Sequence, residues 1–409
     1  MSTTAAIVSV LGSSGRLLAD AVLDWHPRTL PRRGRAVEDA AFLNRLLAEH
    51  GSDARSRAAR ATTVRVREAR PPSSNCSNRV LEVDWAHGEG MPRTLFLKLP
   101  GEPLATRFFC NAIRVWELEC AFFRSFAHDF PLRLPRVHAI ATRGSRFALL
   151  QEDLGADPAV RLFTNRAMLE GVPLELARRC IEAFATFHAH YHGLDAQARE
   201  RRLPLARHPF LSPHMSAISQ AINRAAVEPC RRKAPAVFGA AQAARFPAAM
   251  GRWQDLQAWW YREPLTLVHG DSHIGNFFVD GERMGMLDFQ AAHWSKGIRD
   301  LQYFLVNSMR AEELARHERA LVSEYAAALR ARGVALADDE AWAQYRGFAF
   351  QPLMTIVTSL GLGPLTERDA LMEAVLARAL ALIDRTAFHD WLDALPGAAC
   401  RSRPCSTSA

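Results

Sequence analysis

The chain has 409 residues, of which 49% are hydrophobic and 23% charged, with a formal net charge of +8 and a pI of about 9.4. This length is too great for one small domain, and the composition is that of a globular protein with a large core. No run of 18 apolar residues occurs, and no basic residue precedes the apolar patch near the N-terminus, so neither a transmembrane helix nor a signal peptide is expected. We therefore expect a cytoplasmic protein that does not bind a membrane.

The positive charge is spread along the chain in short arginine-rich runs, such as residues 28–35 and 199–207. Such runs are typical of solvated surfaces, so nucleic acid is not the expected partner. The seven cysteines are odd in number and form no C-x-x-C pair. This pattern favours reduced thiols over a disulfide framework or a zinc site.

The N-terminal third of the chain changes its hydrophobic period twice. Residues 1–35 lack clear periodicity, and we expect an extension with one short helix there, followed by an amphipathic helix over 36–50. From residue 62 to 100 the period is two, which predicts a small antiparallel sheet. Leu95, Leu97 and Leu99 are expected on one face of its last strand, and Phe96 and Lys98 on the other.

A helix is then predicted over residues 106–126, and a short strand over 147–150 followed by a polar connector. The rest of the chain is mostly of helical period. The expected helices cover residues 174–192, 298–331, 340–360 and 366–395. The predicted organisation is an N-terminal extension (1–35), an N-lobe (36–152), a C-lobe (153–395) and a disordered tail (396–409).

One stretch in the predicted C-lobe concentrates short polar side chains. The apolar segment Leu267-Val268 leads into His269-Gly270-Asp271, and Asn276 follows five positions after that aspartate. Asp280-Gly281 is a two-residue turn signal, so residues 276–279 and 284–288 should pair as a hairpin that brings Asp288 back toward Asn276. An amide and a carboxylate suit Mg²⁺, and a further carboxylate can accept the proton of a hydroxyl. This combination is what phosphoryl transfer needs.

Two other interpretations of this stretch stay open. It could be a surface loop with ordinary turn aspartates, although the apolar lead-in argues against that. His269, Asp271 and His273 could also hold zinc as H-x-D-x-H, but Asn276 and Asp288 would then have no role.

Lys98 stands out because only 3 of the 51 basic residues are lysine, the others being Lys233 and Lys296. It could simply extend its ammonium to solvent. Alternatively, a compact charge on a sheet face suits nucleotide phosphates and a glutamate of the next helix. In a bilobal kinase, a lysine on a strand is followed along the chain by a glutamate on a helix, a connector, the loop with the catalytic base, and an aspartate that binds the metal. This chain has the same order. The predicted fold is therefore α+β and protein-kinase-like, with a small antiparallel-sheet N-lobe carrying one main helix and a larger, mainly helical C-lobe.

The phrases LVHGDSHIGNFF, GMLDFQ and GIRDLQYFL resemble the signature of the aminoglycoside phosphotransferase and choline kinase-like small-molecule kinases. They are most similar to the bacterial phosphotransferase and ecdysteroid kinase-like branches. The order of the predicted strands, helices and motifs is similar over residues 36–390. The motifs themselves are most specific over residues 265–305. The resemblance implies transfer of phosphate from ATP, with Mg²⁺, to a hydroxyl of a small organic molecule.

Carried over by position, the resemblance makes Asp271 the catalytic base and Asn276 and Asp288 the metal ligands. Lys98 would bind the α- and β-phosphates, with Glu119 as its partner in the phrase Glu119-Cys120-Ala121-Phe122-Phe123. The remaining positions implied are cofactor-binding residues and structural supports of the catalytic loop. Residues 151–154 would be the hinge, whose backbone binds adenine. The residues are Ser77, Gln151, Glu152 and Leu154 for the cofactor, and His269 and Asp300 for support.

This chain departs from that pattern in the polar segment PPSSNCSN (residues 71–78), which has no glycine where the phosphate-covering loop normally does. Phosphates would have to be met there by Ser, Asn and backbone groups. The departure leaves open an alternative, a nucleotide-binding pseudokinase or scaffold. Gly270 stands where protein kinases have Arg, which favours a small-molecule kinase over a phosphorylation-switched one. The residues do not identify the acceptor.

Overall fold

The computed structural model describes residues 2–22, 30, 37–69, 75–205, 208, 216–363 and 370–396. By internal contacts the chain divides into two compact units. The N-terminal unit comprises Thr3–Leu162 and Phe278–Ala291, and the C-terminal unit comprises Phe163–Phe277 and Ala292–Ala409. Residues 153–162 and 278–291 thus group with the N-terminal unit, whereas the boundary expected after residue 152 assigns them to the C-lobe.

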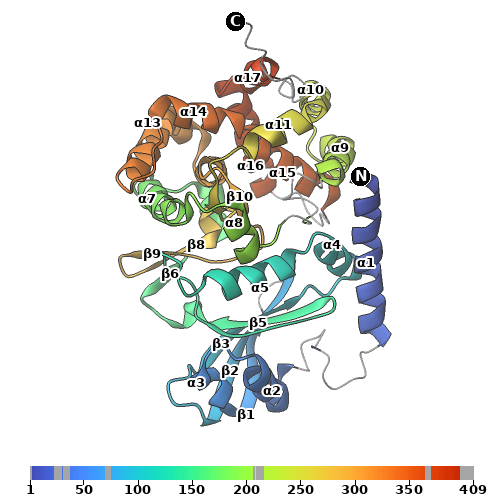
Figure 1. Ribbon diagram of the computed structural model, residues 1–409, viewed down its shortest axis with the longest axis vertical. Coiled ribbons are helices and arrows are strands. Elements are labelled where there is room, and N and C mark those ends of the chain that lie inside the picture. The colour runs from blue at the N-terminus through green and yellow to red at the C-terminus, as the bar shows by residue number, and fades with distance from the viewer. Residues whose placement is uncertain are drawn as a thin grey trace, which may run out of the picture. The chain divides into compact units, whose positions relative to one another are not determined.

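The N-terminal unit is built on a five-stranded antiparallel sheet in the order β1-β2-β3-β5-β4 (Figure 1). The strands of this sheet are β1 (Arg60–Ala69), β2 (Cys76–His87), β3 (Thr94–Pro100), β4 (Val137–Arg143) and β5 (Arg146–Glu152). The helices of the unit are α1 (Ser2–Val22), α2 (Ala40–His50), α3 (Ala54–Ala58), α4 (Leu104–Ala112) and α5 (Val115–Phe126).

The two faces of this sheet pack against different helices. Leu95, Leu97 and Leu99 lie in a buried core with Leu43 and Leu47 of α2, as the alternation of β3 predicts. On the opposite face, Lys98 contacts α5. Because neighbouring residues of a strand point to opposite faces, the alternation separates the apolar core from the charged side chain.

The helix predicted over residues 106–126 is wrong in one respect, because the structure has two helices there. Arg114 adopts φ 58°, a left-handed conformation that ends α4 and begins α5. Its guanidinium pairs with Glu117 one turn into α5. A left-handed residue that is not glycine costs free energy, and no glycine or proline marks the site, so the hydrophobic pattern alone could not reveal the break.

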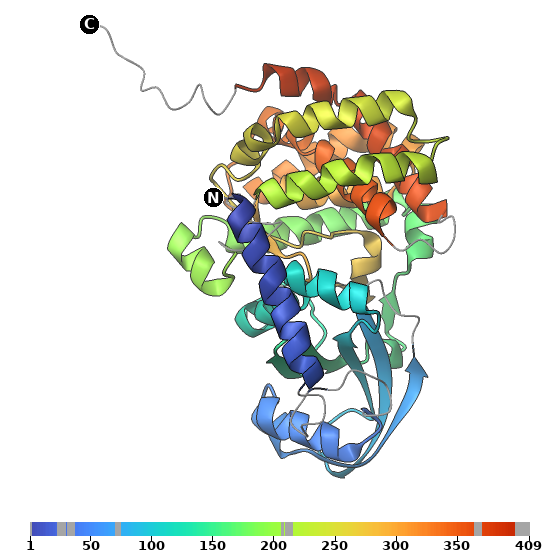
Figure 2. The ribbon, with the colours of Figure 1, turned by 90° about the vertical axis from the view of Figure 1, so that its right-hand side faces the viewer.

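The short helix expected in the N-terminal extension is a long one, α1, which runs beside α4 (Figure 2). Asp20 near its end accepts hydrogen bonds from the backbone and the hydroxyl of Ser145, and Arg16 donates to the carbonyl of Asn111. These contacts make α1 part of the N-terminal unit. Residues 23–29 and 31–36 lie outside the described part of the chain, as does the predicted tail from residue 397.

The C-terminal unit is mainly helical, as expected (Figure 1). Its helices are α6 (Asn165–Glu170), α7 (Leu174–Tyr191), α8 (Ala196–Arg202), α9 (Ser216–Lys233), α10 (Ala240–Gly251), α11 (Trp253–Trp260), α12 (Ile298–Ser308), α13 (Ala311–Arg330), α14 (Asp338–Gly347), α15 (Phe350–Leu362), α16 (Ala370–Arg385) and α17 (Phe388–Ala394). Every residue of α12 is buried. This helix therefore forms the centre of the unit.

Short strands flank the polar stretch from His269 to Asp288 or lie within it. In the C-terminal unit, β7 (Thr266–Val268) pairs with β10 (His293–Ser295). The predicted hairpin is present as β8 (Phe277–Asp280) and β9 (Arg283–Met286), and β6 (Val160–Leu162) pairs with β8. Gly281 in the turn has φ 60°, which explains the glycine after Asp280.

Candidate active site

A group of three charged side chains, two buried and one partly exposed, lies in the N-terminal unit. The ammonium of Lys98 is 2.7 Å from Glu119 Oε1 and 3.1 Å from Asp288 Oδ1. Burial by itself lowers the pKa of Lys98, but the charges of Asp288 and Glu119 outweigh it and raise that pKa above its ordinary value. Lys98 is therefore held as a cation beside two carboxylates.

Asp288 reaches Lys98 from a strained backbone. Its φ of 66° is the left-handed conformation, which a non-glycine residue adopts at a cost. The next residue, Phe289, is fully buried and stacks on Phe122 of α5 with ring centroids 3.7 Å apart. The stacking holds the backbone that orients the Asp288 carboxylate. One third of the Asp288 side chain stays exposed.

Gln290 links this group to Asn75, which lies within the polar segment 71–78. Its amide nitrogen is 3.4 Å from Glu119 Oε2 and 3.2 Å from the sulfur of Cys76, and its amide oxygen accepts from Asn75 at 3.1 Å. Sequence reasoning gave Gln290 no role. Its position directly after the Asp288-Phe289 pair is the signal that could have found it.

The strand register decides which cofactor residues share the face of Lys98. Asn78 pairs with Lys98 across β2 and β3, and Gln151 pairs with Phe96 across β3 and β5, so both lie on that face. Among the described residues, Asn78 Oδ1 and Gln151 Nε2 are buried without a hydrogen-bond partner. Buried polar atoms normally have partners, so these two fit a polar ligand such as a nucleotide over this face.

The structure does not bring two other predicted cofactor residues to that face. Ser77 pairs with Leu99, which belongs to the core on the α2 side. It also lies in β2 and not in a loop, which corrects the predicted polar loop over 71–78 at its end; residues 71–74 lie outside the described part. Glu152 pairs with Leu95, and both of its oxygens accept from Arg133 at 2.6 and 2.8 Å.

The predicted connector at residues 151–155 also needs correction at its start. Gln151 and Glu152 belong to β5, which lies between β3 and β4, so the ladder uses their backbone groups. Leu154 follows in a short 3-10 turn over Leu154–Ala156 and is buried. Only the side chain of Gln151 is therefore available on the face of Lys98.

The second group of polar side chains lies in the C-terminal unit. Asn276 donates from its amide nitrogen to the carbonyl of Asp271 at 2.7 Å and lies 3.5 Å from Asp271 Oδ2. This leaves Asn276 Oδ1 as the amide atom that can ligate a cation. His273 Nε2 is 3.7 Å from Asp271 Oδ2.

Burial by itself would raise the pKa of Asp271, but the charges of His273 and His269, with hydrogen bonds from His273 and Tyr303, lower it below its ordinary value. Because the side chain is 43% exposed, burial raises the pKa of Asp271 only a little, and the pKa stays below its ordinary value. Asp271 is therefore a carboxylate at neutral pH.

Asp300 at the start of α12 holds the loop that carries Asp271. It is fully buried and accepts from the backbone nitrogens of His269 and Gly270 at 2.6 and 2.9 Å. The hydroxyl of Ser272 donates to the carbonyl of Asp300 at 2.9 Å. The imidazole of His269 accepts from the backbone nitrogen of Asp271 at 3.2 Å. Both predicted support residues therefore contact the loop directly.

Three residues that sequence reasoning missed complete this support. His188 Nε2 is 3.3 Å from Asp300 Oδ2, and its Nδ1 is 2.8 Å from the hydroxyl of Tyr325. Tyr303, one turn after Asp300, hydrogen-bonds to Asp271. The spacing of Asp300 and Tyr303 places both on one face of α12, but the complete burial of that helix removes the amphipathic pattern that would have shown it.

The zinc interpretation of His269, Asp271 and His273 finds no support in this region. Within the part of the chain that the structure describes, no three His, Cys, Asp or Glu side chains are grouped to hold a metal, which leaves the H-x-D-x-H zinc alternative without a cluster. Among the same residues, no helix combines the length and apolar character needed to cross a bilayer.

Comparison with known proteins identifies the family. The model of the Ecdysteroid kinase-like family matches residues 95–336, more than half of the chain, and the chain belongs to that family. It is a family of kinase-like small-molecule phosphotransferases. Comparison with curated proteins found no match.

Solved structures of small-molecule kinases are similar to this chain. A choline kinase from Cryptosporidium parvum Iowa II is 10% identical with a TM-score of 0.51, covering 81% of this chain and 93% of its own. A choline/ethanolamine kinase family protein from Mesorhizobium loti is 17% identical with a TM-score of 0.47, covering 80% and 91%. An amicoumacin kinase in complex with AMP-PNP and Ca²⁺ is 14% identical with a TM-score of 0.45, covering 88% and 96%. The choline kinase, with the TM-score above 0.5, supports the fold. The expected α+β, kinase-like fold is confirmed.

Proposed function

We propose that this chain transfers the γ-phosphoryl group of ATP to a hydroxyl of a small organic molecule. The observation that carries the proposal is the buried Lys98 between the carboxylates of Glu119 and Asp288. A lysine held in this way is a fixed point charge for nucleotide phosphates. Membership of a family of small-molecule phosphotransferases supports the same reaction.

Lys98 would bind the α- and β-phosphates, and Glu119 would keep its ammonium in place. The unpaired amide nitrogen of Gln151 would meet the base, and Asn78 Oδ1 would meet a donor of the bound nucleotide. Leu154 and the backbone after β5 would flank the base. Ser77, predicted from the resemblance, would contribute no side-chain contact from its present face, and Glu152 would act only through its backbone.

Asp271 is proposed as the base. It would accept the proton of the acceptor hydroxyl, whose oxygen forms a bond to the γ-phosphorus while the bond to the β–γ bridging oxygen breaks and ADP leaves. Its lowered pKa keeps it ionised and ready to orient the hydroxyl. Because it is a weak base, proton transfer would come late in the step, after the phosphoryl group has begun to move.

Asn276 and Asp288 are proposed as the ligands of Mg²⁺. The free Oδ1 of Asn276 and the partly exposed carboxylate of Asp288 are the hard oxygen donors that this ion takes. When bound, the ion would neutralise charge on the transferred phosphoryl group.

Replacement of Asp271 by Asn tests the proposal. ATP-dependent phosphorylation should fall below detection while Mg·ATP binding changes less than threefold, because the amide keeps the shape but cannot take a proton. Asp390→Asn, on the exposed face of α17, is the control and should keep full turnover. Turnover that survives in Asp271→Asn would contradict the assignment of the base.

The acceptor has to be found by screening ATP consumption with chemically distinct alcohols. Polyhydroxylated steroids, choline-like amines, aminoglycosides, macrolides and sugars cover the range that the family and its fold suggest. One observation favours a second candidate, a nucleotide-binding protein without turnover, since residues 71–78 contain no glycine. Stabilisation by Mg·ATP with no ATP loss against any acceptor would favour that candidate.

A further inference from the structure

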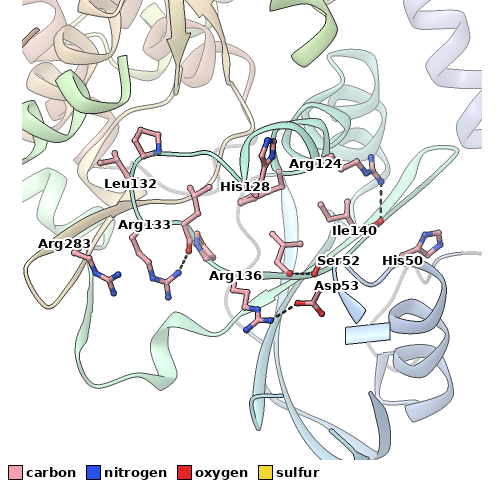
Figure 3. Close-up of a pocket in the computed structure, with 16 residues that line it drawn as sticks. His50, Ser52, Asp53, Arg124, His128, Leu132, Arg133, Arg136, Ile140 and Arg283 are labelled. Carbon is pink, nitrogen blue, oxygen red and sulfur yellow. Dashed lines mark hydrogen bonds and ion pairs between the residues drawn. The ribbon is translucent and has the colours of Figure 1, made fainter. Parts of the chain in front are cut away.

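The N-terminal unit contains a groove that the proposed reaction does not use. It is bounded by the last turns of α5, the segment 131–136, the start of β4 and the turn between α2 and α3 (Figure 3). Its volume is about 850 Å³, within the range of small-molecule sites. None of Lys98, Glu119 and Asp288 lines it. We call it the back groove.

The walls of the back groove combine apolar and cationic side chains. Phe123, Leu132 and Ile140 contribute apolar surface, while four arginines and two histidines line the same space. Asp53 is the one carboxylate in its lining among the residues the structure describes. A groove of this composition suits a ligand with an apolar body and an anionic end.

The arginines differ in how far their charge is already compensated. Arg133 is bonded to Glu152 and Asp280, so it ties the chain together and is not free for a ligand. Arg136 shares its charge with Asp53 at 2.8 Å across the groove. Figure 3 shows this ion pair on the opposite side of the groove from Arg124.

Arg124 is the exception, because it donates only to neutral oxygens. Its guanidinium is 3.3 Å from the carbonyl of Ile140 and 3.3 Å from the hydroxyl of Thr142, and no carboxylate of the described chain lies within ion-pair distance. Arg124 is exposed and its charge contributes to lowering the pKa of Glu117, but it forms no ion pair among the described residues. Its guanidinium beside an apolar wall therefore stays available to a carboxylate or phosphate.

We propose that the back groove binds a small amphipathic anion, with its apolar chain on Phe123, Leu132 and Ile140 and its carboxylate or phosphate at Arg124. Arg136, across the groove, keeps its ion pair with Asp53 at 2.8 Å. The two head groups share the same chemistry here, and the experiment below separates them.

The back groove is mechanically joined to the Lys98 group. Phe123 of its wall follows Phe122, which stacks on Phe289 next to Asp288, and Glu119 lies one turn earlier on α5. The backbone of Arg133 is also bonded to the β8–β9 hairpin at Met286. Because both routes lead to the carboxylates around Lys98, occupancy of the groove should change nucleotide affinity, and Mg·ATP should change the anion's affinity by the same factor.

Isothermal titration of the full chain with octyl phosphate, octanoate and 1-octanol tests the site. Saturable one-to-one binding of at least one anion, at least tenfold tighter than 1-octanol, is the expected result, and the ratio of the two anions identifies the preferred head group. Arg124→Gln should weaken the anion at least fivefold and leave 1-octanol unchanged. Arg65→Gln, an exposed arginine of β1 outside the groove, should change neither.

Three results would overturn the inference: no saturable anion binding, equal binding of 1-octanol, or equal loss in Arg124→Gln and Arg65→Gln. Thermal unfolding of both variants verifies that they fold. Binding is measured without turnover, so the result tests the back groove independently of the proposed kinase reaction. The coupling is tested by repeating the titration with Mg·ATP present, where an unchanged affinity would remove the link to Lys98.

Discussion

The three lysines of this arginine-rich chain all donate to oxygens in buried or half-buried places. Lys98 meets two carboxylates, Lys233 meets three carbonyls at the end of α15 at 2.8 to 3.3 Å, and Lys296 meets the carbonyl of Arg262 at 2.6 Å. A compact ammonium can serve oxygens converging on one point, which a planar guanidinium does less well. The rarity of lysine therefore indicates packing constraint at all three positions, and only Lys98 joins the candidate site.

At the same scale, Tyr303 acts through Asp271. Its buried hydroxyl donates to that carboxylate, and its own pKa is raised far above the ordinary value by burial and by the charge of Asp271, so it stays protonated. Tyr303→Phe removes one of the influences that lower the pKa of Asp271. We expect kcat to fall about tenfold and the acid limb of the kcat/KM profile to move to higher pH.

Tyr345→Phe is the matched control for Tyr303→Phe. Its hydroxyl donates to a buried carboxylate, Glu318, at 2.8 Å in the same unit but outside the candidate site. Both variants should lose about 1 kcal/mol of unfolding free energy. A pH profile that is the same in the two variants would reduce Tyr303 to a structural role.

Among the elements, α12 organises the candidate site. Asp300, Tyr303 and Ser308 on this helix contact loop residues on both sides of Asp271, and the hydroxyl of Ser308 accepts from the backbone nitrogen of Ile274 at 2.9 Å. One rigid, buried helix thus holds the loop at its start, middle and end. Precise placement of a base depends on such support.

Asp300→Asn should destabilise the protein by about 3 to 5 kcal/mol, because a buried carboxylate bonded to two backbone N–H groups and an imidazole is replaced by a neutral amide. Burial would raise the pKa of Asp300, but His188, Arg299 and His269 lower it below its ordinary 3.8. The contribution of Asp300 to the free energy of unfolding is therefore complete above its pKa in the unfolded state. It is lost as the pH falls toward the lower pKa of the folded state.

Urea unfolding of wild type and Asp300→Asn at pH 7, 5, 4 and 3 measures this contribution. The difference in unfolding free energy should stay constant from pH 7 to 5 and shrink below about pH 4. A difference that is unchanged down to pH 3 would contradict a lowered pKa for Asp300.

Binding of Mg·ATP should raise the free energy of unfolding of the whole molecule. A ligand at one hundred times its Kd adds about 2.7 kcal/mol to the unfolding free energy when it binds only the folded state. Lys98→Met removes the charge for the phosphates and should abolish this gain, whereas Asp271→Asn should keep it. The measurement is urea unfolding with and without Mg·ATP; a gain retained in Lys98→Met would place the phosphates elsewhere.

The fold was largely predictable because its signals are local and periodic. Alternation in β3 separates Leu97 from Lys98, and the Asp280-Gly281 pair indicates the hairpin, since each depends on neighbours a few positions apart. The break at Arg114 was not predictable, because tertiary packing supports a left-handed arginine that has no local signature. The length of α1 was missed because its sequence lacks clear amphipathic period.

The sequence by itself determined the family of this protein, the lysine, glutamate and aspartate that contact one another around Lys98, and the order in which the loop residues follow. Motif spacing identifies the loop residues because they lie close together along the chain, whereas Lys98 and Glu119 follow from the order of features in the family that the sequence resembles. Only the tertiary structure decided that Ser77 and Gln151 lie on opposite sheet faces, that α12 holds the Asp271 loop through Tyr303 and Asp300, and that a cationic groove lies behind α5. Those relations join residues far apart in sequence, and strand register and helix packing set them.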